Sequence, residues 1–143
     1  MAKKTEQRRI LIVDGDPHAI GGITRVFGQL KIPYESILEA STGKQVLGVL
    51  RKGTKEAFDI VVVAASLPDM KATDFIPGAL RICRAHPPRI IATSPDIRLR
   101  DELKKAGANA FVRKLDDPMH PINPSIMTAC VKTEFEFLDQ HTP

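Results

Sequence analysis

The apolar run at residues 58–64, Phe-Asp-Ile-Val-Val-Val-Ala, constrains the fold of this chain more than any other feature. Its β-branched residues favour a strand. Apart from Asp59 near its start, the run is apolar on both faces of such a strand. Strands of that kind are typical of parallel sheets that carry helices on both sides. We therefore expect an α/β fold built around this segment.

Four further short runs have the character of strands, and a segment with helical spacing of apolar residues follows each run. The other strands are expected at residues 10–13, 36–40, 89–93 and 110–114. The helices are expected at residues 17–31, from 43 onward, at 74–84, 97–105 and 125–140. This alternation predicts a doubly wound, five-stranded parallel sheet with five helices.

The length of 143 residues is that of a single domain. We expect a flexible basic tail at residues 1–8, a domain at 9–140 and a short tail at 141–143. Within the domain, a proline-rich connection at 116–124 leads into the last helix, at 125–140.

The sequence also indicates a compartment. No apolar run reaches the length of a membrane span, and no signal-peptide pattern follows the basic start. Cys83 and Cys130 lack the spacing of a metal site or a redox motif, which is typical of free thiols in a reducing environment. We therefore expect a cytoplasmic protein.

The functional site of such a sheet lies beyond the carboxyl ends of its strands. The predicted strand ends bring together Asp14, Asp16, Thr93 and Lys114. Carboxylates bind Mg²⁺, while a hydroxyl and an ammonium group bind phosphate oxygens. The central strand, however, ends in Ala64, whose side chain has no reactive group. The pattern predicts a phosphate-type site that lacks its nucleophile.

Five segments, in order and spacing, resemble the motifs of response-regulator receiver domains, the CheY-like family. They are residues 10–17, 39–43, 58–70, 90–94 and 106–114. The resemblance covers about residues 9–114. It implies a flavodoxin-like sheet with the strand order 2-1-3-4-5 and a role in a bacterial two-component pathway.

The departures from the family pattern are more informative than the matches. The resemblance places the phosphoacceptor aspartate at Ala64 and the second acidic metal ligand at Gly15. It also places the proline that follows the lysine at Leu115. It therefore implies a degenerate pseudo-receiver that is not phosphorylated and is not an enzyme. We expect no cofactor, no metal site and at most weak Mg²⁺ binding, because Mg²⁺ needs more than one well-placed carboxylate.

The retained positions allow two interpretations. Asp14, Thr93 and Lys114 match the family, and Phe111 stands where a switch aromatic is usual. In the interpretation we favour, Asp16 caps the first helix and Asp14 pairs with Lys114; the alternative is a remnant metal site. For Thr93, a switch hydroxyl and a hydroxyl bonded to the backbone stay equally open.

A surrogate phosphoacceptor is the main alternative. Asp59 precedes Ala64 by five residues, roughly 16 Å at about 3.3 Å per residue, and lies at the wrong end of the strand. Asp69, in the following turn, is closer to the strand ends. It is either such an acceptor or, as we favour, an exposed turn residue.

The last predicted helix carries an apolar arc of roughly 180°, which is wider than one core-facing stripe needs. The arc also contains Glu134. We expect part of it to bind a protein partner or a second copy, the alternative being a wide core face. The residues assigned to this interaction face are Met127, Val131, Phe135, Phe137 and Leu138. The family resemblance likewise implies partner contacts through helix 4, strand 5 and helix 5.

Our leading hypothesis is a stand-alone signalling adaptor that acts through protein–protein contacts. The second is a working receiver phosphorylated at a surrogate residue such as Asp69. The third is a nucleic-acid-binding module, suggested by the basic residues of the second half and the net charge of +4. We consider nucleic acid unlikely, because acidic residues interrupt the basic ones and no recognition helix is evident.

Overall fold

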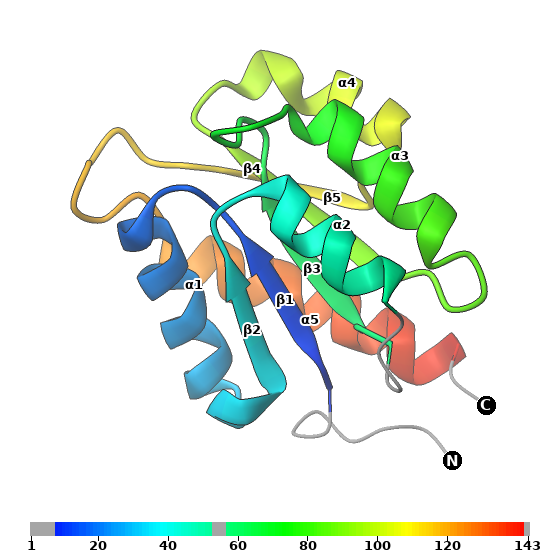
Figure 1. The fold of residues 1–143 in the computed structure, drawn as a ribbon. Helices are drawn as coiled ribbons and strands as arrows, with labels where there is room; N and C mark the ends of the chain where they lie inside the picture. Colours follow the sequence, from blue (N-terminus) through cyan, green and yellow to red (C-terminus); the bar gives the residue numbers. More distant parts are fainter. Residues whose placement is uncertain (1–7, 53–56, 142–143) are drawn as a thin grey trace.

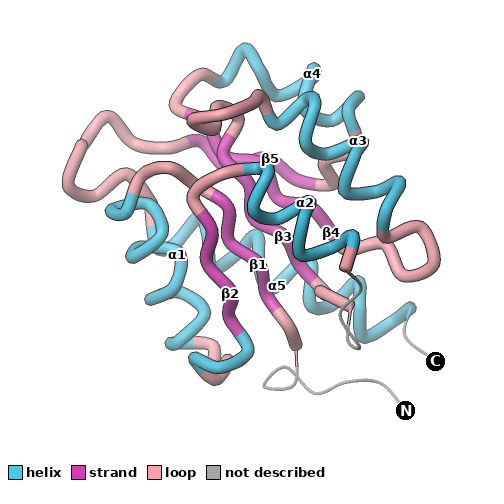
Figure 2. The backbone as a smooth tube through the Cα atoms, viewed as in Figure 1, coloured by secondary structure: helices cyan, strands magenta, loops and turns pink. Residues whose placement is uncertain are grey.

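A computed structural model describes residues 8–52 and 57–141 of the chain. At its centre is a five-stranded parallel sheet with the order β2-β1-β3-β4-β5, which confirms the predicted fold (Figures 1 and 2). The strands are β1 (Ile10–Val13), β2 (Ile37–Ala40), β3 (Ile60–Ala64), β4 (Arg89–Ser94) and β5 (Ala110–Arg113).

Five helices cover the two faces of the sheet. They are α1 (Pro17–Gln29), α2 (Gly43–Arg51), α3 (Ala72–Ile82), α4 (Arg100–Ala106) and α5 (Pro124–His141). Helices α1 and α5 pack on one face and α2, α3 and α4 on the other, so the sheet separates two apolar clusters (Figure 1). Within the described residues, no helix is long and apolar enough to cross a membrane.

Burial along the strands follows their place in the sheet. Every residue of β1 and β3 is buried, whereas no residue of the edge strand β2 is. The prediction that the run ending at Ala64 is covered on both faces is therefore confirmed. Its central position follows from the physical rule that a strand without polar alternation has no face suited to water.

Local signals set most helix boundaries. The Asp16 carboxylate accepts a hydrogen bond from the His18 N–H at 2.9 Å, directly before Pro17 opens α1. Thr42 and Gln45 form a capping box at the start of α2. Gly107, with φ of 125°, ends α4 in a conformation that favours glycine.

Most helix ends lie within two residues of the prediction, and the starts of two helices differ in an informative way. Helix α3 begins at Ala72 rather than residue 74. The prediction placed the start too late because Lys71, the residue before the helix, makes no side-chain capping bond that a sequence pattern could reveal. The helix expected at 97–105 begins as a separate 3-10 turn (Ile97–Leu99), which Asp96 caps through the Arg98 N–H at 3.0 Å. The α-helix itself, α4, begins only at Arg100, after this turn.

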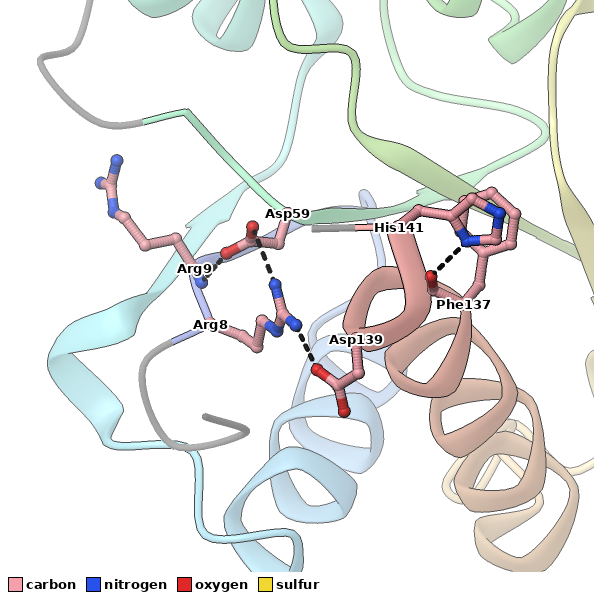
Figure 3. A network of polar contacts seen from close by, with 6 residues as sticks. All are labelled: Arg8, Arg9, Asp59, Phe137, Asp139 and His141. Carbon is pink, nitrogen blue, oxygen red and sulfur yellow. Dashed lines mark hydrogen bonds and ion pairs between the residues drawn. The ribbon is translucent and has the colours of Figure 1, made fainter. Parts of the chain in front are cut away.

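Arg8 does not belong to the predicted flexible tail. Arg8 is 1% exposed, so assigning it to a flexible tail is wrong. Its guanidinium forms an ion pair with Asp139 of α5 and lies 3.6 Å from the Asp59 carboxylate just before β3 (Figure 3). A buried cation with two carboxylate neighbours is held in place rather than solvated. The rest of the predicted tail, and residues 142–143, lie outside the described residues.

Helix α5 also corrects the predicted interaction face. Met127, Val131 and Phe135 are at most 5% exposed and belong to the core cluster under α1 and α5, so they are not available to a partner. Leu138 is half-buried against the same cluster, and only Phe137 of the predicted set is exposed. The arc is wide because the helix packs against both the sheet and α1, where Phe135 meets Phe27 edge-on.

The reason for the error is Glu134. We expected its charge to exclude part of the arc from the core, yet Glu134 is 3% exposed. Its carboxylate accepts a hydrogen bond from Arg89 Nε at 2.6 Å. A paired carboxylate can be buried where an unpaired one cannot, so the whole arc except its margins faces inward.

Candidate functional site

The parallel register brings the predicted site residues to one edge of the sheet. Ala64 and Thr93 are directly paired across β3 and β4. The N–H of Asp14 donates to the Ala40 carbonyl at 3.0 Å, and the N–H of Lys114 donates to Ser94 at 2.8 Å. We call the ends of the strands at this edge, from Asp14 to Lys114, the carboxyl rim.

Asp14 and Lys114 close the carboxyl rim. Lys114 Nζ donates to Asp14 Oδ2 at 2.8 Å, and both side chains are largely buried, 12% and 4% exposed respectively. Asp14 Oδ1 accepts the N–H of Asp16 at 2.9 Å. The favoured interpretation is therefore confirmed: Asp14 pairs with Lys114, and Asp16 caps α1. Both oxygens of the one deeply buried carboxylate at the rim are already engaged.

The loop after β3 occupies the space beside Gly15. A Cβ atom at this position would lie 2.9 Å from Pro68 Cγ and 3.0 Å from Pro68 Cδ. These distances are shorter than van der Waals contact, so a side chain at residue 15 requires the Pro68 ring or its neighbours to shift. At Gly15, where the family resemblance implies an acidic ligand, the Pro68 ring occupies the adjacent space.

Asp69 is engaged with the start of α2. Its two carboxylate oxygens accept the N–H groups of Gly43 and Lys44, each at 2.9 Å. These two hydrogen bonds are the main reason why the pKa of Asp69 lies below its ordinary value. Asp69 is an exposed turn residue, as favoured, but its carboxylate also holds the loop against α2. The sequence did not predict this contact, because no local pattern links Asp69 to the start of α2, 25 and 26 residues away.

Thr93 and Phe111 have different environments. Thr93 is fully buried, and within the part of the chain that the structure describes its hydroxyl has no hydrogen-bond partner. The interpretation of a hydroxyl bonded to the backbone is therefore wrong. Phe111 is half-buried and packs against the core cluster beneath α2, α3 and α4. On the neighbouring strand, the residue paired with Thr93 is Ala64, whose side chain carries no reactive group.

The donor groups at the carboxyl rim do not fit a magnesium ion. Asp14 is neutralised by Lys114, one Asp16 oxygen caps α1, and Gly15 and Ala64 supply no ligand. Among residues 8–52 and 57–141, no three His, Cys, Asp or Glu side chains are grouped as metal ligands. Protein-bound Mg²⁺ keeps several waters but needs one or two available carboxylates, whereas the buried carboxylate of this set, Asp14, is already paired with Lys114.

The opposite edge of the sheet carries a network that sequence reasoning did not find. Arg8, Asp59 and Asp139 meet there (Figure 3). This confirms that Asp59 lies far from Ala64, at the other end of the strand. Beside it, the Arg89 guanidinium lies 3.8 Å from the centre of the Phe137 ring, which stacks on His141. We call these contacts, together with Arg89–Glu134, the amino-end network. Arg8 and Arg89 are far in sequence from the α5 residues they meet, and Arg8 is far from Asp59, so no local pattern indicates these contacts.

Comparisons of the sequence and of the structure with known proteins give different results. No protein-family description and no curated protein matches the sequence. The structure, in contrast, resembles the BeF3-activated receiver domain of DrrB from Thermotoga maritima, with a TM-score of 0.69 and 26% identity. That match covers 90% of this chain and 97% of the DrrB domain. The chain has the fold of a response-regulator receiver domain.

Other structures support the receiver fold. A CheY-like receiver protein from Methanospirillum hungatei has a TM-score of 0.72 at 20% identity, covering 93% of this chain and 97% of the other. The receiver domain of a Pseudomonas aeruginosa sensor histidine kinase, with a magnesium ion coordinated in its active-site cleft, has a TM-score of 0.72 at 15% identity. That match covers 90% of this chain and 98% of the other.

Proposed function

We propose that this chain is a pseudo-receiver, a receiver-fold protein that signals without accepting a phosphoryl group. The observation that carries the proposal is the closed carboxyl rim. Lys114 neutralises Asp14 at 2.8 Å, next to a strand that ends in Ala64, and Pro68 fills the space beside Gly15. Alanine has no oxygen to phosphorylate, and the retained lysine already has a counter-ion.

The proposed role is that of a non-enzymatic adaptor in a bacterial two-component pathway, acting in the cytoplasm through protein contacts. The elements α4, β5 and α5 are the proposed contact face. Ile97 just before α4, and Ile126 and Phe137 on α5, supply exposed apolar surface on or next to these elements. Homodimerisation through the same face is one form of this contact. The thiols Cys83 and Cys130 are free, in keeping with a reducing compartment.

Intact-mass measurement after incubation with Mg²⁺ and acetyl phosphate tests the loss of phosphorylation. We expect no phosphoryl adduct on this protein. The Ala64→Asp variant serves as the matched comparison, and we expect little or no adduct on it, because restoring the acceptor does not restore the metal ligands. A stoichiometric adduct on the unmodified protein would overturn the proposal.

If an adduct forms, the Asp69→Asn variant distinguishes the working-receiver alternative. Loss of the adduct in that variant would assign Asp69 as a surrogate acceptor. The structure disfavours this outcome, because both Asp69 oxygens accept backbone N–H groups of α2. A phosphorylated Asp69 would have to release those hydrogen bonds.

Light scattering over a concentration series tests the contact face as a self-association surface. Ile97 is 52% exposed, so Ile97→Asp removes apolar surface without disturbing the core. We expect any dimer of the unmodified protein to dissociate in this variant. A dimer that persists unchanged would place the interface elsewhere.

A further inference from the structure

A cavity of about 510 Å³ lies between α1 and the connection that follows β5. In Figure 1 this connection, yellow to orange, swings out beside the start of α1. The cavity belongs to neither the carboxyl rim nor the amino-end network. Its size falls within the range of small-molecule sites, about 300–1,000 Å³. We propose that it binds a small amphipathic anion, with a flat apolar body and one acidic group.

The wall contributed by the connection is held in one conformation. The Leu115 N–H donates to the Pro121 carbonyl at 2.7 Å, a bond that a proline at position 115 could not make. The Asp117 carboxylate accepts the N–H of Met119 at 3.0 Å. Ile122 is 5% exposed and packs in the core under α1. The wall therefore exists before a ligand arrives, which lowers the entropic cost of binding.

Adjacent glycines of α1 shape the other wall. A Cβ atom on Gly22 would lie 3.0 Å from the Cβ of Ile122, so the absence of a side chain lets the connection approach the helix. A Cβ atom on Gly21 would have no atom within 4 Å, although Gly21 lines the cavity. The close approach at Gly22 brings α1 and the connection together along one side of the cavity. The absence of a side chain at Gly21 leaves the interior of the cavity open. Glycine is otherwise unfavourable within a helix relative to alanine.

The chemistry of the lining specifies the ligand. Apolar contact comes from Leu115 and Met119, which are 43% and 61% exposed. The charged or titratable groups of the lining are Arg25, His18 and His120, and no carboxylate lines the cavity. Arg25 has no ion-pair partner within the described chain, whereas His120 lies 3.4 Å from Asp117. An exposed apolar surface beside one unpaired cation is complementary to an apolar anion.

Anilinonaphthalene sulfonate is the probe, with the neutral phenylnaphthylamine as its uncharged counterpart. We expect saturable binding of one sulfonate probe per chain, seen as a fluorescence increase, and weaker binding of the neutral probe. Gly21→Leu should lower the affinity about tenfold or more, because its side chain fills the cavity. Gly28→Leu is the matched control: Gly28 lies in the same helix, also has open space at its Cβ, and does not line the cavity.

Arg25→Gln tests the charge. We expect about threefold weaker binding of the sulfonate probe, in keeping with an exposed ion pair, and unchanged binding of the neutral probe. Amide shifts of Gly21 and Gly22 on titration should locate the probe. The proposal is overturned if Gly21→Leu binds normally, if Gly28→Leu weakens binding equally, or if neither probe binds. Binding that disappears as protein concentration rises would assign the cavity to a second copy instead.

Discussion

The two ends of the sheet use charge in different ways. At the carboxyl rim, one lysine and one aspartate neutralise each other beside an alanine. At the amino end, Arg8 binds the Asp139 carboxylate of α5 (Figure 3). Arg89 binds Glu134 of the same helix and also covers the Phe137 ring. The rim is where receiver-like chemistry is expected, yet the amino-end network holds more charged groups. Charge in this chain mainly fastens the last helix and the strands together.

The burial of a charged side chain does not by itself determine the cost of removing it. Arg8 is more buried than Lys114, at 1% against 12% exposed side chain. The cost of breaking an ion pair, however, depends on the partner that stays behind without a counter-ion. Asp14 is 4% exposed and cannot turn to water, whereas Asp139 is 47% exposed and can. The rim pair should therefore be the more sensitive of the two.

The largest expected effect is that of Lys114→Met. Removing the ammonium group leaves the Asp14 carboxylate buried without a counter-ion, and we expect the free energy of unfolding to fall by about 3–5 kcal/mol. Urea denaturation measures it. The double variant Asp14→Asn/Lys114→Met should recover most of the loss, because no charge is then stranded. Lys104→Met, on the exposed face of α4, is the control, with an expected change within about 0.5 kcal/mol.

Arg8→Met should be the next most destabilising change, at about 2–3 kcal/mol. The loss is smaller than at the rim because Asp139 can rehydrate and Asp59 keeps the N–H of Arg9 at 2.8 Å. The same denaturation experiment measures it. Arg100→Met is the control, since Arg100 is 55% exposed and lies 3.9 Å from an exposed Asp101. An Arg8 effect larger than that of Lys114 would contradict the argument from the remaining partner.

Thr93→Val sharpens the contrast at the rim itself. Because the buried hydroxyl has no hydrogen-bond partner within the described residues, replacing it with a methyl group should stabilise the fold by about 1 kcal/mol. Thr24→Val is the matched control: the Thr24 hydroxyl donates to Glu39 at 2.9 Å, so its loss should be slightly destabilising. A shift in melting temperature measures both. Destabilisation by Thr93→Val would mean that the hydroxyl is used.

The smallest expected effect is the pH dependence at Asp69. Its pKa in the folded protein is lowered below 3.8 by the N–H groups of Lys44 and Gly43. A lowered pKa means that the carboxylate stabilises the fold above the pKa of the unfolded chain, and that this contribution is lost as the pH falls through the folded value. The stability difference between the unmodified protein and Asp69→Asn should therefore shrink on acidification. Urea midpoints at neutral and acidic pH measure this; a constant difference would contradict it.

Local sequence signals predicted most of the fold. The Asp16–Pro17 pair, the Thr42 capping box and Gly107 act within a few residues, so their helix boundaries follow from the sequence. The start of α3 was missed because Lys71 offers no such signal. The face of α5 was misassigned because the partner of Glu134, Arg89, is 45 residues away.

The candidate site was predicted in part for the same reason. Strand ends in a parallel sheet meet at one edge, so the pairing of Asp14 with Lys114 follows from the strand order although 100 residues separate them. The hydrogen bonds of Asp69 to α2 and the position of Pro68 beside Gly15 depend on how the loop after β3 packs. No periodicity describes a loop, which is why these contacts were not foreseen.

The sequence by itself determined the order of strands and helices, the buried centre of the sheet and the absence of an acidic side chain at Ala64 and Gly15. These follow from residue identity and from patterns that repeat over a few residues. Only the tertiary structure decided that the rim is closed, that α5 is fastened by Arg8 across 131 residues, and that α1 and the proline-rich connection enclose a cavity. Such contacts join distant segments, and their geometry depends on the packing of the whole chain rather than on any local preference.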